Sequence, residues 1–281
     1  MTRTRAAGLT AALCASYFIS CAGAPAAALS GGDSFYSLNQ YGGLTIVEYR
    51  GSKKNIVIPT TINNMDVNVI GRGAFAGKGI TGAELPETII RIEDRAFMNN
   101  KLKSIKLPAG LKFIGDEAFK KNRIETINLP EGVAEIGFRA FEKNRVAELA
   151  LPSSLKTAGD YCFADNRVKS VEFSENIDVI PAGMFERNNI EILRLPDAVR
   201  LIGAKAFAGN PIEALSFWGG EHAGKGAFAD AKLKVIGIAA NVVFDSPREM
   251  GLGFQNAYKS MGGAAGIYYK QSGDFWWIKE D

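Results

Sequence analysis

The chain has 281 residues, of which 47% are hydrophobic and 22% charged, and its formal net charge is +3. A charge this close to neutrality gives no reason to expect nucleic acid as a partner. The chain contains one histidine and three cysteines, which excludes metal sites built from several histidines and a dense framework of disulfides.

Residues 1–28 have the pattern of an export signal. Arg3 and Arg5 precede an apolar stretch from about Ala6 to Ile19, which is too short to span a bilayer and is followed by small residues. Removal of this signal takes away these two arginines and no acid, and so reduces the 33 basic residues to 31, against 30 acidic ones. The sequence therefore predicts an exported protein, and no other segment predicts a transmembrane span.

Two ways of processing the signal fit the sequence. Cys21 is placed like the acylated cysteine of a bacterial lipoprotein, although Phe18 stands where leucine is usual. Ala26-Ala27-Ala28 offers an ordinary cleavage site instead. The protein is then either lipid-anchored through Cys21 or released as a soluble chain, at the cell surface, in the outer envelope or in the periplasm.

Residues 29–70 are expected to form an N-terminal cap with an incomplete first repeat. The segment from Leu44 to Tyr49 alternates apolar and polar residues, which is typical of a half-buried β-strand. Repeat arrays need such atypical ends because the first coil would otherwise expose its apolar interior.

A regular repeat follows, over residues 71–245. It is most visible in eight phenylalanines, whose positions in the sequence differ by 22 at six successive steps and by 21 at the last. A period of this size indicates one structural coil copied many times and stabilised by stacking on its neighbours. The eight phenylalanines are Phe75, Phe97, Phe119, Phe141, Phe163, Phe185, Phe207 and Phe228.

Each coil combines four short motifs. A Leu-Pro step such as Leu107-Pro108 ends an alternating apolar segment, and Ile-Gly and Ala-Phe pairs follow, as in Ile114-Gly115 and Ala118-Phe119. Asn122 comes three residues after Phe119, and an asparagine recurs at this position every 22 residues. The apolar segment predicts a strand, so that the stack carries a parallel sheet on one face, and the asparagines predict a buried ladder that satisfies backbone groups at a corner.

These motifs resemble the BspA-type leucine-rich repeat proteins of bacterial surfaces, whose repeat is similar to Leu-Pro-x-x-Leu-x-x-Ile-Gly-x-x-Ala-Phe-x-x-Asn. The similarity extends from about Asn55 to Phe228. It implies a leucine-rich repeat solenoid of about eight repeats. It also implies a surface protein that attaches bacteria to host matrix proteins, such as fibronectin or fibrinogen, or to other cells.

The outward side chains of the predicted strands are the first candidate binding surface, which we call the strand face. They vary between coils while the inward residues stay apolar, as a recognition surface on a rigid frame requires, although an untouched surface would vary as well. The strand face comprises Ser104, Lys106, Thr126, Asn128, Glu148, Ser170, Glu172, Ile192, Arg194 and Ser216.

Basic residues beside the repeated asparagine are the second candidate surface, which we call the basic edge. The period of the repeat stacks them into one column that could hold a sulfated glycan or an acidic protein. The alternative is a solvated corner that keeps the array soluble. The basic edge comprises Lys101, Lys121, Arg123, Lys143, Arg145, Arg167 and Arg187.

Residues 246–281 are expected to form a C-terminal cap with a short helix and a hairpin. Ser246-Pro247 has the pattern of a helix start, and two aromatic segments follow, joined through Gln271-Ser272-Gly273. Most of these aromatic residues should cover the end of the core. Alternation would bury either Trp276 or Trp277 and leave the other ring free for a partner or another copy of the chain.

No motif indicates an enzyme, a cofactor or a metal site. His222 lies in a glycine-rich segment without a recognisable catalytic pattern, and Cys162 stands in the register of the small buried alanines. The pairs Glu93-Asp94 and Asp116-Glu117 lie beside basic residues, which favours a charged turn over a calcium site.

The sequence thus favours an exported, non-enzymatic protein that binds proteins or glycans in an adhesin-like manner. A different class remains open, a periplasmic structural scaffold that associates with copies of itself through its caps or a sheet edge.

Overall fold

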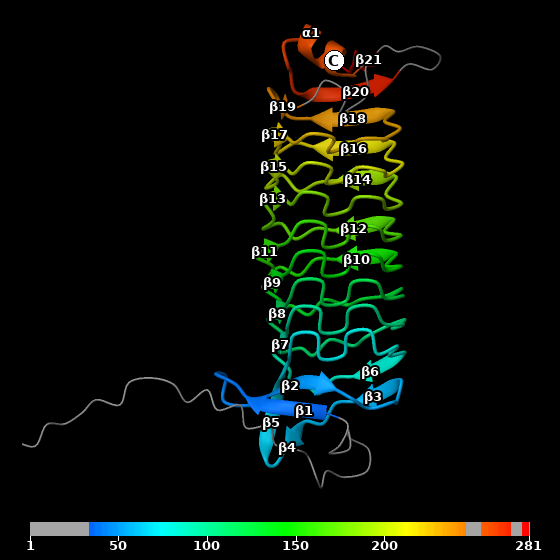
Figure 1. Cartoon of the computed structure of the whole chain (residues 1–281). Helices are drawn as coiled ribbons and strands as arrows, with labels where there is room; N and C mark the ends of the chain where they lie inside the picture. Colours follow the sequence, from blue (N-terminus) through cyan, green and yellow to red (C-terminus); the bar gives the residue numbers. More distant parts are fainter. Residues whose placement is uncertain (1–33, 246–253, 271–276, 281) are drawn as a thin grey trace, which may run out of the picture.

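The computed structural model describes residues 34–245, 254–270 and 277–280. Over most of that length the chain winds into a straight stack of coils, with its first strands at one end and its last strands at the other (Figure 1). The predicted leucine-rich repeat solenoid is confirmed, with coils of about 22 residues, many short strands and one helix among the described residues. The predicted signal segment and Cys21 lie outside the described residues.

One wall of the stack, which we call the second wall, is built from the Ile-Gly motifs. Their strands pair in parallel from coil to coil, for example Ile92 with Ile114 and Ile114 with Ile136. The first sheet contains, in spatial order, β1 (Ser34–Leu38), β2 (Leu44–Tyr49), β5 (Met65–Ile70), β7 (Arg91–Ile92), β8 (Phe113–Ile114), β9 (Glu135–Ile136) and β11 (Thr157–Ala158), with β4 (Thr61–Ile62) beside β5. A second sheet continues this wall with β13 (Val179–Ile180), β15 (Leu201–Ile202), β17 (His222–Ala223) and β19 (Val243–Phe244).

The strands of the wall that carries the strand face fall, within the described residues, into three separate sheets. Around Ser104 and Thr126 the pairing is reduced to a single parallel bridge between these two residues. The sequence predicted a parallel sheet on one face of the stack. The structure has short strands on two walls, because the Ile-Gly segments are extended as well. The strands are β3 (Asn55–Val57) with β6 (Gly82–Glu84), β10 (Glu148–Ala150) with β12 (Ser170–Glu172), and β14 (Ile192–Arg194), β16 (Ala214–Phe217), β18 (Val235–Ile238), β20 (Gly266–Lys270) and β21 (Trp277–Lys279) in one sheet.

The repeated phenylalanines form the predicted spine. Their rings stack face to face between neighbouring coils, with centroids 5.0 Å apart for Phe75 and Phe97 and 6.0 Å apart for Phe163 and Phe185. All eight side chains are buried. A large apolar ring in every layer, touching the same ring above and below, is what gives an array of small coils one continuous core.

The asparagine ladder is also confirmed. Asn122 is buried, and its Nδ2 donates to the carbonyl oxygens of Phe97 and Phe119 at 2.9 and 3.0 Å. Its Oδ1 accepts from the backbone nitrogen of Leu102 at 3.1 Å. One side chain thus satisfies three backbone groups in two coils, and the same pattern recurs at Asn100, Asn144, Asn166, Asn188 and Asn210.

Both ends of the stack are covered by irregular elements. At the N-terminal end, the predicted strand Leu44–Tyr49 is β2, which pairs antiparallel with β1 and parallel with β5. At the other end, helix α1 (Phe254–Ser260) brings Phe254 and Tyr258 against Tyr268 of β20. The Tyr258 hydroxyl also donates to the Ala239 carbonyl at 2.6 Å. These buried rings cover the last coil.

The predicted C-terminal hairpin is present in part. Strand β21 pairs antiparallel with β20, with Trp277 opposite Lys270. The expected helix start at Ser246-Pro247, the connection at 271–273 and Trp276 lie outside the described residues. For Trp277 the structure describes the backbone alone, so an aromatic contact at this end stays a prediction.

Candidate functional site

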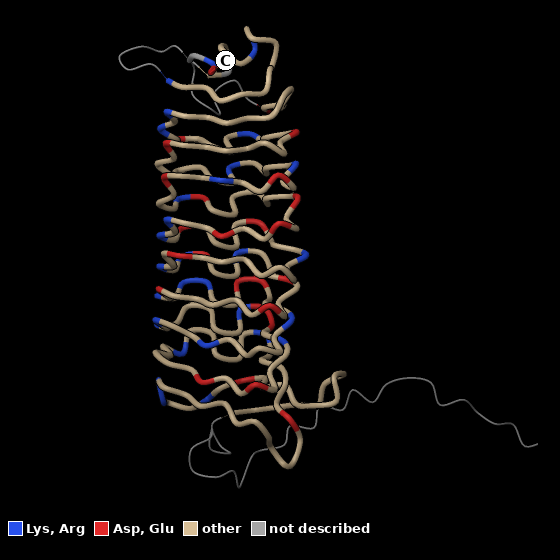
Figure 2. Tube along the Cα trace, turned by 180° about the vertical axis from the view of Figure 1, so that it is seen from behind, with Lys and Arg blue, Asp and Glu red and all other residues tan. Residues whose placement is uncertain are grey.

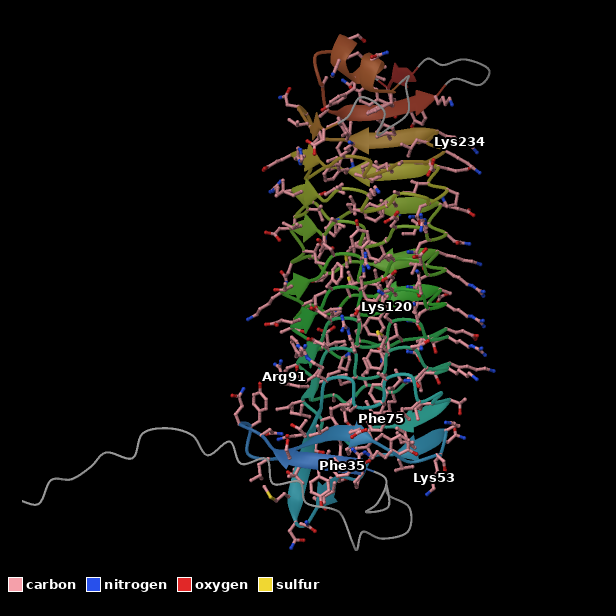
Figure 3. The ribbon with its side chains drawn as sticks, in the orientation of Figure 1. Phe35, Lys53, Phe75, Arg91, Lys120 and Lys234 are labelled. Atoms are coloured by element: carbon pink, nitrogen blue, oxygen red, sulfur yellow. The ribbon has the colours of Figure 1, made fainter. Side chains whose placement is uncertain are left out.

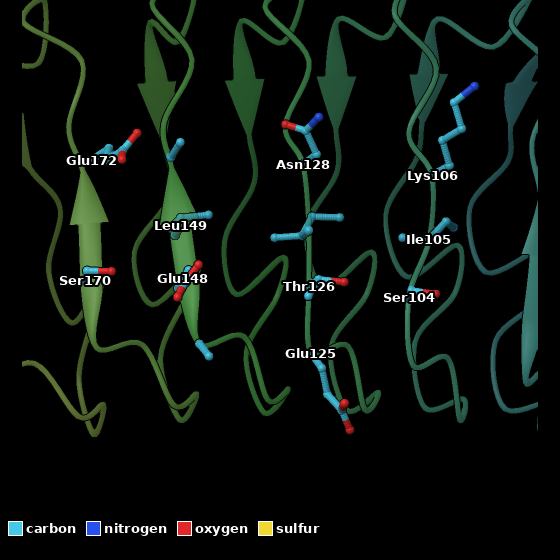
Figure 4. Close-up of a pocket in the computed structure, with 13 residues that line it drawn as sticks. Ser104, Ile105, Lys106, Glu125, Thr126, Asn128, Glu148, Leu149, Ser170 and Glu172 are labelled. Atoms are coloured by element: carbon cyan, nitrogen blue, oxygen red, sulfur yellow. The ribbon is translucent and has the colours of Figure 1, made fainter.

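The strand face presents two parallel rows of side chains to solvent (Figure 4). The predicted alternation along each strand is correct, because the side chains of both rows are exposed while the residues between them, such as Ile105 and Leu149, are buried. One row contains Ser104, Thr126, Glu148 and Ser170, and the other contains Lys106, Asn128 and Glu172.

The rest of the strand face continues along β14 and β16. Ile192 and Arg194 are exposed, and Arg194 is opposite Ser216 in the next coil. Ser216 is half-buried beside the buried Leu215. The side chains thus change from polar in the first coils to a mixture of apolar, basic and hydroxyl groups in the later ones.

A shallow depression of about 780 Å³ lies in the strand face. It extends across four coils, from Ser104 to Glu172, and its lining offers hydroxyl, amide, carboxylate and ammonium groups. A smaller hollow of about 600 Å³ follows between Lys169 and Arg194. Hollows of this form suit an extended partner that spans several coils, because each coil contributes only one or two side chains.

The basic edge lies at the corner where the chain enters the strand face. Lys121, Lys143 and Arg187 have the left-handed backbone, with φ of 58°, 60° and 55°, and the ladder asparagine follows each of them. Six of the seven basic side chains are exposed, and Arg145 is half-buried. In Figure 3, nitrogen-tipped side chains project along the edge between Lys53 and Lys234.

The basic edge is wider than the sequence predicted. Lys103 and Lys169 are exposed beside it, shortly after Lys101 and Arg167 respectively. Lys169 stands three repeats after Lys103, but Glu125 and Ala147 hold this position in the two coils between them, so the repeat gave no clear signal for either lysine.

The carboxylates of the acidic pairs Glu93-Asp94 and Asp116-Glu117 form hydrogen bonds and ion pairs within the stack. The Oδ1 atoms of Asp94 and Asp116 accept backbone N–H groups of the next coil, from Asp116 at 3.0 Å and from Phe138 at 2.7 Å. Glu117 forms ion pairs with Arg95 at 2.7 Å and Lys120 at 2.6 Å. The described residues contain no group of three side chains suited to hold a metal ion.

Lys120 is the centre of a charged cluster within the wall. Its Nζ lies 2.6 Å from Glu117 and 3.0 Å from Glu142, and all three side chains are largely buried. The hydrogen bond from Lys120 holds the pKa of Glu117 below its usual value. Burial alone would lower the pKa of Lys120, but the two carboxylates outweigh it and raise that pKa.

His222 and Cys162 occupy structural positions. His222 begins β17, and its Nε2 lies 2.6 Å from Oδ1 of Asp245 on the neighbouring coil, so this histidine has a partner. Cys162 is fully buried, as predicted, and burial raises the pKa of its thiol well above the usual value. A thiol in this environment is a poor nucleophile.

Exposed apolar side chains gather on the second wall, which was not among the surfaces predicted from the sequence. Val179, Leu201 and Val243 point outward from strands of one sheet, and Phe138 is exposed on an earlier coil. Val179 and Leu201 lie one repeat apart and pair in neighbouring coils, so their spacing could have predicted an exposed apolar column. The Ile-Gly motif identifies only the inward residue beside each of them.

The fold and these surfaces can be compared with known proteins. Six copies of the family model described as "BspA type Leucine rich repeat region" match residues 68–186 and 112–234, which together make up more than half of the chain. The chain belongs to the BspA-type leucine-rich repeat family. No curated protein matches it.

Solved structures of other bacterial proteins have a similar fold. The leucine-rich repeat protein TpLRR of T. pallidum is 26% identical, with a TM-score of 0.56 over 63% of this chain and 86% of that one. A leucine-rich repeat protein from Bacteroides ovatus is 21% identical, with a TM-score of 0.54 over 76% and 70% of the two chains. The pneumococcal vaccine antigen PcpA is 22% identical, with a TM-score of 0.51 over 75% and 69%.

The described residues contain no helix that is both long and apolar enough to cross a membrane. The roles assigned to the strand face and the basic edge remain predictions, since their geometry alone names no ligand.

Proposed function

We propose that this protein is an exported, non-enzymatic binding protein that holds a protein ligand on its strand face and acts at the bacterial surface in an adhesin-like manner. The observation that carries the proposal is the pair of exposed rows between Ser104 and Glu172, which line a depression across four coils. Membership of the BspA-type family supports it, because leucine-rich repeat proteins typically bind proteins.

The rigidity of the strand face supports this function physically. The outward side chains stand on a backbone fixed by buried residues such as Ile127 and by the Asn122 ladder. A surface that is already ordered loses little conformational entropy on binding, so a modest set of polar contacts suffices for affinity. The exposed rows have few aromatic side chains, and we therefore expect affinity to be distributed over several coils.

The ligands to test first are the host matrix proteins fibronectin and fibrinogen. Biolayer interferometry with the full chain would compare the wild type with Thr126→Arg, which places a long charged side chain in the depression. Thr157→Arg is the matched control, because Thr157 is an exposed threonine of β11 on the second wall. We expect the first substitution to weaken binding at least tenfold and the second to leave it unchanged.

Equal binding by both variants would place the ligand elsewhere on the protein. If the wild type binds no matrix protein and sedimentation shows it to assemble with copies of itself, a structural scaffold becomes the better description. Export, a lipid anchor at Cys21 and surface location are parts of the same proposal, supported by the sequence of residues 1–28.

A further inference from the structure

The basic edge carries evenly spaced positive charges in direct register. The backbone nitrogens of Arg123, Arg145 and Arg167 each donate to a carbonyl of the preceding coil, at 2.9, 2.9 and 3.0 Å. Coils joined by such bonds are separated by roughly 4.8 Å. Lys101 occupies the same position one coil earlier and forms the same bond, at 2.8 Å. Four cations thus form a straight column along the stack.

The side chains of the basic edge are poorly neutralised by the protein itself. In Lys143, Arg145 and Arg187 the side-chain nitrogen lies 3.6 to 3.8 Å from a carboxylate oxygen. The corresponding distances for Lys120 within the wall are 2.6 and 3.0 Å. Among the described residues, the members without an ion pair are Lys101, Lys121, Arg123 and Arg167. A nearly neutral protein therefore keeps a strip of positive charge that its own carboxylates compensate only in part. Blue segments recur along the corresponding edge in Figure 2, interrupted by a few red ones.

The backbone at this corner does not require basic residues. Gly77 and Gly209 occupy the same left-handed position as Lys121 and Lys143, and Asn99 and Asp165 occupy it in two other coils, so the turn accepts glycine, asparagine or aspartate. A side chain in this conformation is disfavoured, and lysine offers no local hydrogen bond in return. The turn geometry therefore does not by itself select lysine at these positions.

From this geometry we propose that the basic edge binds a linear acidic polysaccharide, sulfated or rich in uronic acids, laid along the axis of the stack. The column is a convex corner and not a pocket, which suits a polymer and not a small anion. Three arginines in succession suit sulfate and carboxylate groups, because the guanidinium fork binds both in a bidentate manner.

Other polyanions fit the edge less well. Single-stranded nucleic acids are held by aromatic side chains on which the bases stack, and no aromatic residue interrupts the column. Surface-bound segments on a membrane insert apolar side chains beside their basic ones, and the column offers none to insert. The basic edge also differs from the strand face, so the two ligands can be tested separately.

The test uses a heparin oligosaccharide of defined length as probe and isothermal titration calorimetry with the full chain. The triple variant Arg123→Ser, Arg145→Ser, Arg167→Ser removes three charges of the column. The control Lys112→Ser, Lys156→Ser, Lys225→Ser removes three exposed charges outside the basic edge and the strand face. We expect the first variant to lose at least tenfold in affinity and much of its salt dependence, and the control to change less than twofold.

Circular dichroism would verify that both variants fold. A wild type that does not bind the oligosaccharide, or two triple variants that lose affinity equally, would overturn the proposal. Equal or tighter binding of single-stranded DNA or of vesicles rich in anionic lipid would overturn the choice of polysaccharide. Thr126→Arg, which tests the strand face, should retain binding of the oligosaccharide, because it removes no charge of the basic edge, so failure of the protein ligand leaves this test intact.

Discussion

Replacement of Asn144 by alanine should be among the most damaging single substitutions in the stack. This side chain lies in a central coil and is buried. Its Nδ2 donates to the carbonyls of Phe119 and Phe141 at 2.9 and 3.0 Å, and its Oδ1 accepts from the Ile124 nitrogen at 3.0 Å. Alanine would leave three backbone groups without these partners.

A buried polar group that loses its hydrogen bond costs about 1–3 kcal/mol, so the three groups together predict a loss of about 3–5 kcal/mol once the coil relaxes. The free energy of unfolding of a native protein is roughly 5–15 kcal/mol, so a loss of this size would remove a large part of the stability. Urea denaturation followed by circular dichroism would measure it. Neighbouring coils stabilise each other, and the defect should also reduce the cooperativity of unfolding.

Arg145→Ala is the matched control, because Arg145 is the next residue and makes only a long ion pair with Glu125. We expect it to change the free energy of unfolding by less than about 0.5 kcal/mol. If Asn144→Ala lost less than about 1 kcal/mol, the ladder would be a consequence of the fold and not a cause of its stability.

Three further predictions concern the interior. Phe141→Ala should cost about 3–5 kcal/mol in urea denaturation, because it removes one ring of the stacked spine, and a loss under about 1 kcal/mol would contradict a continuous core. The pKa of Glu117 is lowered, so its stabilisation is complete above the pKa of the unfolded chain and is lost as pH falls through the folded pKa. Thermal denaturation from pH 6 to pH 3 should therefore lose less stability in Glu117→Gln than in the wild type, and parallel curves would refute this. Cys162 should resist a thiol reagent until urea unfolds the protein, and fast labelling of the native chain would contradict its burial.

The spine and the ladder could be predicted because each depends on the same residue in the next coil. Phe97 touches Phe75 and Phe119, and Asn122 bonds to carbonyls in two coils, so both positions keep the period of the fold. The residue after the phenylalanine has no such constraint. It is Lys120 in one coil and Glu142 in the next, and only the structure shows that these two form an ion pair.

The surfaces were predicted less completely than the interior. The outward direction of Ser104 and Thr126 followed from alternation and is correct. The exposed apolar residues of the second wall, such as Val179, were missed because the motif identifies only the inward residue beside them. Outward side chains are not fixed by stacking, so the repeat predicts where a ligand could bind but leaves its identity to experiment.

The proposed function requires that the repeats are exposed at the cell surface, and protease accessibility on intact bacterial cells tests this requirement. A periplasmic protein, measured in the same sample, serves as the control for leakage. We expect the repeats to be digested or released while the control protein stays intact. Protection of the repeats on intact cells, followed by digestion after lysis, would contradict the adhesin-like function and place the binding surfaces inside the envelope.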